Sequence, residues 1–140
     1  MVWFAPLAVI DAVLFDWRGT TFTDQADADW IRDAAASIGR RLSDDDIASI
    51  LDRGSAVMRD RPDIRDALDR SDTSPEAHRA ANMAWFGAIG LEDELATAIY
   101  ERDGHPEASF PFDDVRAVMH TLKEHGKKIA LVSNIHYDLR

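Results

Sequence analysis

The sequence contains no cysteine, comparatively few basic residues and no long apolar run. Without cysteine the chain cannot form disulfides, use a thiol nucleophile, or hold zinc or an iron–sulfur cluster through thiolates. Its 16 basic residues against 26 acidic ones give a formal net charge of −10. This balance argues against a nucleic-acid partner, because phosphate binding needs a basic surface. The 140 residues, 46% of them hydrophobic, suit one compact domain.

The longest apolar stretch covers residues 1–15, and Pro6 and Asp11 interrupt it. It is too short to span a bilayer and lacks the basic start of a signal peptide. We therefore expect no membrane partner and a cytoplasmic location.

Two buried strands are predicted over residues 9–15 and 129–132, because both segments are almost wholly apolar. Between them apolar residues recur at helical spacing. Ser43 before three aspartates and Ser74 before Pro75 are typical helix starts. Residues 111–114 predict the start of a last helix. The order indicates an α/β fold with a parallel strand pair, in which most of the helices form an inserted subdomain.

Polar side chains follow both predicted strands. Asp16 comes directly after the first, where ligands bind in open α/β sheets and where a carboxylate can act as nucleophile or magnesium ligand. Ser133 and Asn134 follow the second and suit an anion. The same residue types also cap turns and helices, so a purely structural role stays open at both positions. Adjacent parallel strands would place Asp16 and Ser133 side by side.

Residues 15–20, Phe-Asp-Trp-Arg-Gly-Thr, resemble the first motif of the haloacid dehalogenase superfamily. Residues 131–134, Leu-Val-Ser-Asn, resemble its second motif. The resemblance implies a Rossmann-like parallel core, incomplete here, formed by residues 1–23 and 109–140. Residues 24–108 fall where the superfamily inserts a helical cap.

The resemblance also implies roles for single residues. Asp16 is similar to the nucleophile, which forms an aspartyl intermediate and binds Mg²⁺ together with the backbone carbonyl of Arg18. The hydroxyl of Ser133 is similar to the group that holds the phosphoryl or carboxylate of a small anionic substrate. The residues expected to bind or surround that substrate are Arg18, Gly19, Thr20, Ser133 and Asn134.

Arg18 departs from the phosphatase pattern, in which a second aspartate stands two residues after the nucleophile as general acid and base. A guanidinium stays protonated and cannot donate that proton, a loss of about 10²–10⁴ in rate. A 2-haloacid dehalogenase needs no such group, because halide leaves without a proton, so both substrate classes stay open. A phosphonoacetaldehyde hydrolase is excluded, because its cap needs a lysine and residues 24–108 contain none.

The superfamily's third and fourth motifs, a lysine and acidic metal ligands, lie well beyond the second motif, and the sequence ends at Arg140. The resemblance therefore implies a hydrolase with weak Mg²⁺ binding and impaired activity. The alternative is an inactive, truncated fragment or pseudo-enzyme that acts through protein–protein association. A two-stranded sheet has open edges and an uncovered apolar face, so both interpretations predict a homo-oligomer or a strand-exchanged dimer.

Overall fold

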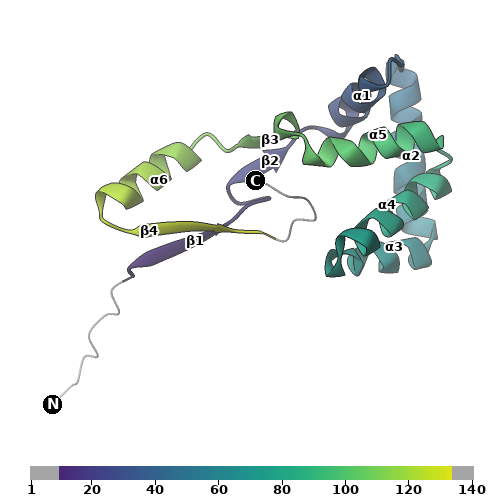
Figure 1. Ribbon diagram of the computed structural model, residues 1–140. Helices are drawn as coiled ribbons and strands as arrows, with labels where there is room; N and C mark the ends of the chain where they lie inside the picture. The colour runs from purple at the N-terminus through teal and green to yellow at the C-terminus, as the bar shows by residue number, and fades with distance from the viewer. Residues whose placement is uncertain (1–9, 134–140) are drawn as a thin grey trace. The chain divides into compact units, whose positions relative to one another are not determined.

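The computed structural model describes residues 10–133 (Figure 1). The described chain divides into two compact units. The first holds residues 10–23 and 110–133, and the second holds residues 24–109.

The first unit is built on two strands, β1 (Ala12–Asp16) and β4 (Lys128–Val132), which run parallel. Ala12 lies opposite Lys128, and Asp16 lies opposite Val132. Helix α6 (Val115–Glu124) comes directly before β4 in the chain and packs against it (Figure 1). The α/β fold and the parallel pair predicted from the sequence are confirmed, and together they form an incomplete Rossmann-like core.

The prediction that both strands are buried on both faces is wrong. On the face toward α6, Val13, Phe15 and Ile129 are half-buried and Leu131 is 46% exposed. On the other face Leu14 is 66% exposed and Val132 is 54% exposed. The physical reason is that α6 can cover only one face of the pair, and the opposite side chains stay in contact with solvent.

The last helix also begins later than predicted. Residues 109–111 form a short strand, β3 (Ser109–Pro111), which pairs with β2 (Phe22–Asp24). The amide of Phe112 then donates to the carbonyl of Thr21 at 3.1 Å. Proline favours an extended residue before it, so Phe110 stays in the strand and the helix begins at Val115, with Asp114 at its N-cap.

The second unit is helical. Its helices are α1 (Asp27–Ser37), α2 (Asp44–Asp60), α3 (Pro62–Asp69), α4 (Pro75–Ile89) and α5 (Asp93–Glu101), with short 3₁₀ turns at Ser71–Thr73, Arg102–Gly104 and Pro106–Ala108. Apolar residues at helical spacing meet in one core that includes Ile31, Ala34, Ile47, Ile50, Phe86, Ile89 and Leu95. The indole Nε1 of Trp30 donates to the carbonyl of Ile99 at 2.9 Å and so ties α1 to α5.

The two helix starts predicted at Ser43 and Ser74 are confirmed. Ser43 and Asp46 form a reciprocal capping box at α2, in which the Ser43 hydroxyl accepts from the Asp46 amide. Ser74 accepts from the Ala77 amide at α4. Helix α3 was not predicted from the sequence. It is only 8 residues long, and among them Ile64 alone is buried.

Among residues 10–133, no helix has the length and apolar character needed to cross a membrane.

Candidate functional site

Asp16 is the last residue of β1, and its side chain is exposed. The register sets Asp16 opposite Val132, so Ser133 comes directly after the residue that faces Asp16. Ser133 is half-buried. The parallel pairing therefore brings the two strand ends that carry Asp16 and Ser133 to the same edge of the sheet. Asn134 lies outside the described residues.

The loop after Asp16 is closed by backbone hydrogen bonds. The carbonyl of Trp17 accepts from the amides of Thr21 at 3.0 Å and Phe22 at 2.9 Å. The amide of Gly19 donates to the carbonyl of Phe22 at 2.8 Å. Gly19 has φ +74°, a left-handed conformation that costs other residues energy. The chain thus reverses directly after Asp16 in a tight turn.

Side chains reinforce the same turn. The indole ring of Trp17 stacks on the ring of Phe22, with centroids 4.1 Å apart and planes 1° from parallel. The hydroxyl of Thr21 donates to the carbonyl of Asp16 at 2.9 Å and lies 3.0 Å from the carbonyl of Trp17. These contacts fix the backbone on which the Asp16 carboxylate is carried.

The loop is held by Thr21 and not by its neighbour Thr20. Thr21 is 1% exposed, whereas Thr20, which the sequence motif singles out, is exposed. The sequence reading missed Thr21 as a positioning residue. Two adjacent threonines offered no signal for choosing between them, because the direction of each side chain depends on the turn that Gly19 permits.

A haloacid dehalogenase-like hydrolase family model matches residues 10–139. The chain belongs to this family. The match includes both strand ends, the loop after Asp16 and the whole helical unit. The resemblance drawn from the two motifs is therefore confirmed at the level of the family. No curated protein matches the chain significantly.

In this member of the family, Arg18 stands two residues after Asp16. Its side chain is half-buried, and its backbone forms an isolated bridge with Phe22. The loop contacts hold Arg18 in place from both sides, because Trp17 and Gly19 each bond to Thr21 or Phe22. The backbone of a permanently charged residue is thus held two positions after Asp16.

The metal ligands predicted for this family member were Asp16 and the carbonyl of Arg18. Within residues 10–133, no group of three or more histidine, aspartate or glutamate side chains is placed to hold a metal ion. One carboxylate and one carbonyl oxygen nevertheless match the ligands that Mg²⁺ accepts, since this ion keeps several waters and shares substrate oxygens.

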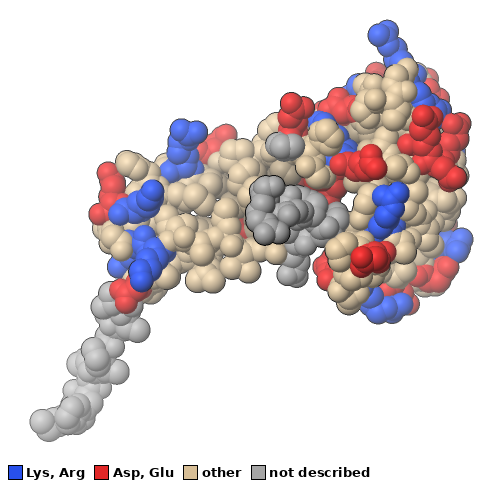
Figure 2. All heavy atoms as spheres, in the orientation of Figure 1, with Lys and Arg blue, Asp and Glu red and all other residues tan. Residues whose placement is uncertain are grey.

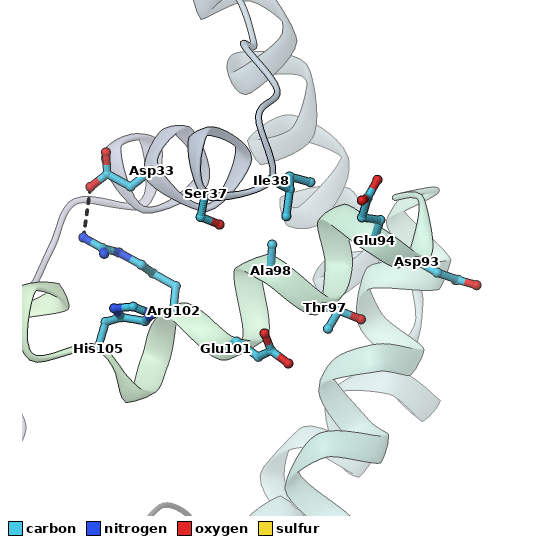
Figure 3. A pocket seen from close by; sticks show the side chains of 10 residues that line it. All are labelled: Asp33, Ser37, Ile38, Asp93, Glu94, Thr97, Ala98, Glu101, Arg102 and His105. Carbon is cyan, nitrogen blue, oxygen red and sulfur yellow. Dashed lines mark hydrogen bonds and ion pairs between the residues drawn. The ribbon is translucent and has the colours of Figure 1, made fainter.

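The helical unit carries a separate pocket of about 630 Å³, lined mainly by α1 and α5 (Figure 3). Arg102 lies at one end, and its guanidinium donates to Asp33 and Gln25, each at 3.0 Å. The Arg102 side chain is 12% exposed, so Asp33 neutralises a largely buried charge. Sequence reasoning had not indicated this pocket, because residues 33 and 102 are far apart along the chain.

A second polar cluster joins α4 to α5. Nδ1 of His78 lies 3.1 Å from the hydroxyl of Tyr100, and the guanidinium of Arg79 lies 5.2 Å from the centre of the Tyr100 ring. Partial burial raises the pKa of the Tyr100 hydroxyl, because its charged form would lose hydration. At neutral pH the tyrosine therefore stays protonated and serves as a hydrogen-bonding link between the helices.

Proposed function

We propose that this family member hydrolyses a small anionic substrate, a phosphate ester or a 2-haloacid, through an aspartyl intermediate on Asp16. The supporting observation is the exposed Asp16 carboxylate at the carboxyl end of β1, in register with Val132, the residue before Ser133. Family membership supplies the reaction class, hydrolysis. The rigid loop after Asp16 suits a nucleophile, because an attacking group must be held in place.

The two units have different proposed roles. We assign residues 10–23 and 110–133 to the catalytic core and residues 24–109 to a helical cap. This boundary differs by one residue from the sequence prediction of a cap over residues 24–108. The cap assignment is supported by the separate helical core of the second unit.

In the proposed reaction, a carboxylate oxygen of Asp16 attacks phosphorus or the halogen-bearing carbon. The alkoxide or halide leaves with the electrons of the broken bond. Water then cleaves the aspartyl intermediate and restores the carboxylate. Ser133 and Asn134 would orient the phosphoryl or carboxylate group of the substrate, while Gly19 and Thr20 border the nucleophile.

Arg18 bears on the choice between the two substrate classes. It cannot protonate a leaving alkoxide, whereas a leaving halide needs no proton. It can bind an anion beside Asp16, which suits either a substrate carboxylate or a departing halide. This observation favours a 2-haloacid over a phosphate ester.

Mg²⁺, where it is used, would be held by the Asp16 carboxylate and the Arg18 carbonyl. It would supply positive charge to offset the substrate's negative charge. A haloacid reaction does not depend on this contribution. A cytoplasmic location remains a prediction.

The experiment measures phosphate release from p-nitrophenyl phosphate and chloride release from 2-chloropropionate, each with and without Mg²⁺. Asp16→Asn is compared with Asp11→Asn, an equivalent change at an exposed carboxylate just before β1. We expect Asp16→Asn to reduce release to the uncatalysed rate, and Asp11→Asn to leave it unchanged. Equal rates for the unmodified chain and Asp16→Asn would favour the non-catalytic alternative, a chain that acts through association.

A further inference from the structure

The first and last segments of the helical unit meet outside its apolar core. The amide of Gln25 donates to the carbonyl of Ala108 at 2.8 Å, and the hydroxyl of Ser109 donates to the carboxylate of Asp24 at 2.9 Å. No described residue of the segments 24–27 and 102–109 belongs to the core of buried apolar side chains. Polar contacts therefore hold these two ends of the unit together.

Arg102 is the centre of these contacts. Its Nη2 donates to Oε1 of Gln25 and to Oδ2 of Asp33, each at 3.0 Å, and Figure 3 shows the pair with Asp33. Nε2 of Gln25 donates to the same Asp33 oxygen at 2.7 Å. The three side chains thus form a closed ring that joins the start of the unit, helix α1 and the turn after α5. We call Gln25, Asp33 and Arg102 the clasp.

Burial separates the clasp from the exposed ion pairs of the same unit. Figure 2 shows acidic and basic side chains spread over the surface of the helical unit on the side drawn. Exposed pairs contribute little to stability, because water already solvates both charges. The side chain of Arg102 is only 12% exposed, so its charge has lost most of its hydration and depends on the clasp for compensation.

The compensation of the Arg102 charge is incomplete. Its Nε is buried and has no hydrogen-bond acceptor among residues 10–133. Its Nη1 lies 4.0 Å from Oε2 of Glu107, which is beyond hydrogen-bond distance. A buried donor without an acceptor costs free energy, and this free energy is recovered when water reaches the donor. The ends of the unit therefore open more readily than its apolar core.

We propose that the clasp is a conformational device. Release of Arg102 lets the two ends of the helical unit open together in one step, while the helical core stays folded. Segments with few buried apolar contacts open at lower free energy than a core does. The chain passes between the two units at residues 23–24 and 109–110, so the clasp holds both connections at once. The device belongs to the helical unit alone and does not depend on the proposed reaction.

Hydrogen exchange of single amides in the full chain tests this device. The amides of Gln25, His105 and Ala108 are hydrogen-bonded within the two ends and report their opening. The amides of Ile50 and Phe86 report opening of the core. In the unmodified chain we expect the three end amides to share one opening free energy, lower than that of the two core amides.

Arg102→Met removes the charge and keeps a long side chain. The three end amides should then exchange about 10- to 100-fold faster, the factor expected when hydrogen bonds to a charged group are lost, and the core amides should not change. Asp33→Asn should act in the same direction. The double variant should exchange no faster than Arg102→Met alone, because both changes remove the same contact.

Arg40→Met is the matched control. Nη1 of Arg40 bonds to Oε2 of Glu92 at 2.7 Å, and this pair also joins distant parts of the helical unit. Its side chains are more exposed, 33% for Arg40 and 73% for Glu92. Arg40→Met should therefore leave the exchange of the end amides unchanged.

The possible outcomes separate a clasp from general stabilisation. Equal acceleration of end and core amides in Arg102→Met, or no acceleration at all, overturns the proposal. Different opening free energies for the three end amides of the unmodified chain overturn the one-step opening. If circular dichroism shows that Arg102→Met does not fold, the milder Asp33→Asn decides by the same criteria.

Discussion

Replacing Thr21 by valine should loosen the loop that carries Asp16, and replacing Thr20 should not. Valine has nearly the shape of threonine but no hydroxyl. Thr21 is 1% exposed, and its hydroxyl donates to the carbonyl of Asp16 at 2.9 Å. Thr20 is exposed, so Thr20→Val is a matched control at the adjacent position.

The expected loss of stability in the loop depends on which carbonyl oxygen loses its hydrogen-bond donor in Thr21→Val. The carbonyl of Trp17 keeps two donors, the amides of Thr21 and Phe22 at 3.0 and 2.9 Å. The carbonyl of Asp16 loses the hydroxyl donor. A buried acceptor left without a partner costs about 1–3 kcal/mol, and part of the hydroxyl's own desolvation is recovered, so we expect about 1–2 kcal/mol.

Hydrogen exchange at the loop amides is the suitable assay, because it reports local opening free energy even if the two units unfold separately. The amides of Gly19, Thr21 and Phe22 are all bonded within the loop. In Thr21→Val they should exchange about 5- to 30-fold faster than in the unmodified chain, the factor that corresponds to 1–2 kcal/mol. Equal exchange rates in Thr21→Val and Thr20→Val would refute the role assigned to Thr21.

Two further predictions concern the helical unit. Ile47 is 2% exposed in its core, so Ile47→Ala should lower the free energy of unfolding by about 2–5 kcal/mol in urea titrations; a change within about 0.5 kcal/mol, typical of a surface site, would contradict this packing. Ser43→Ala should destabilise the protein at neutral pH. Hydrogen bonds from the Ser43 side chain and backbone lower the pKa of Asp46 in the folded protein from its ordinary 3.8. The stabilisation of the folded state by the ionised Asp46 is therefore present above pH 3.8, and it is lost as the pH falls through the lowered pKa of the folded protein. The difference in unfolding midpoint between the two proteins should therefore narrow below pH 3.8, and a constant difference down to pH 2 would argue against the capping box.

Much of the fold could be predicted from the sequence, because the decisive signals are local. Ser43 before three aspartates and Ser74 before Pro75 mark helix starts through contacts made within one turn. The apolar segment 129–132 became β4, lengthened by Lys128. The predictions were less accurate where a contact with a residue distant in sequence determines the local structure. Pro111 ends a strand that pairs with β2, so the expected helix start was displaced to Val115.

The candidate site shows the same division. Asp16, Arg18 and Ser133 were named from two short motifs, and the family match supports the motifs themselves. Thr21 was missed, since its importance comes from a hydroxyl that turns inward to the carbonyl of Asp16. The Arg102–Asp33 ion pair was also missed, because the two residues are far apart along the chain and only the packing of the helices brings them together.

Residue types and their local spacing were enough to predict the family, the two longer strands with most of the helices between them, and the charge balance of the chain. These depend on residue type and on spacing over a few residues. The tertiary structure alone decided the register that sets Asp16 beside the end of β4, and the choice of Thr21 over Thr20. It also decided which side chains of β1 and β4 pack toward α6, because that helix lies on one side of the strand pair.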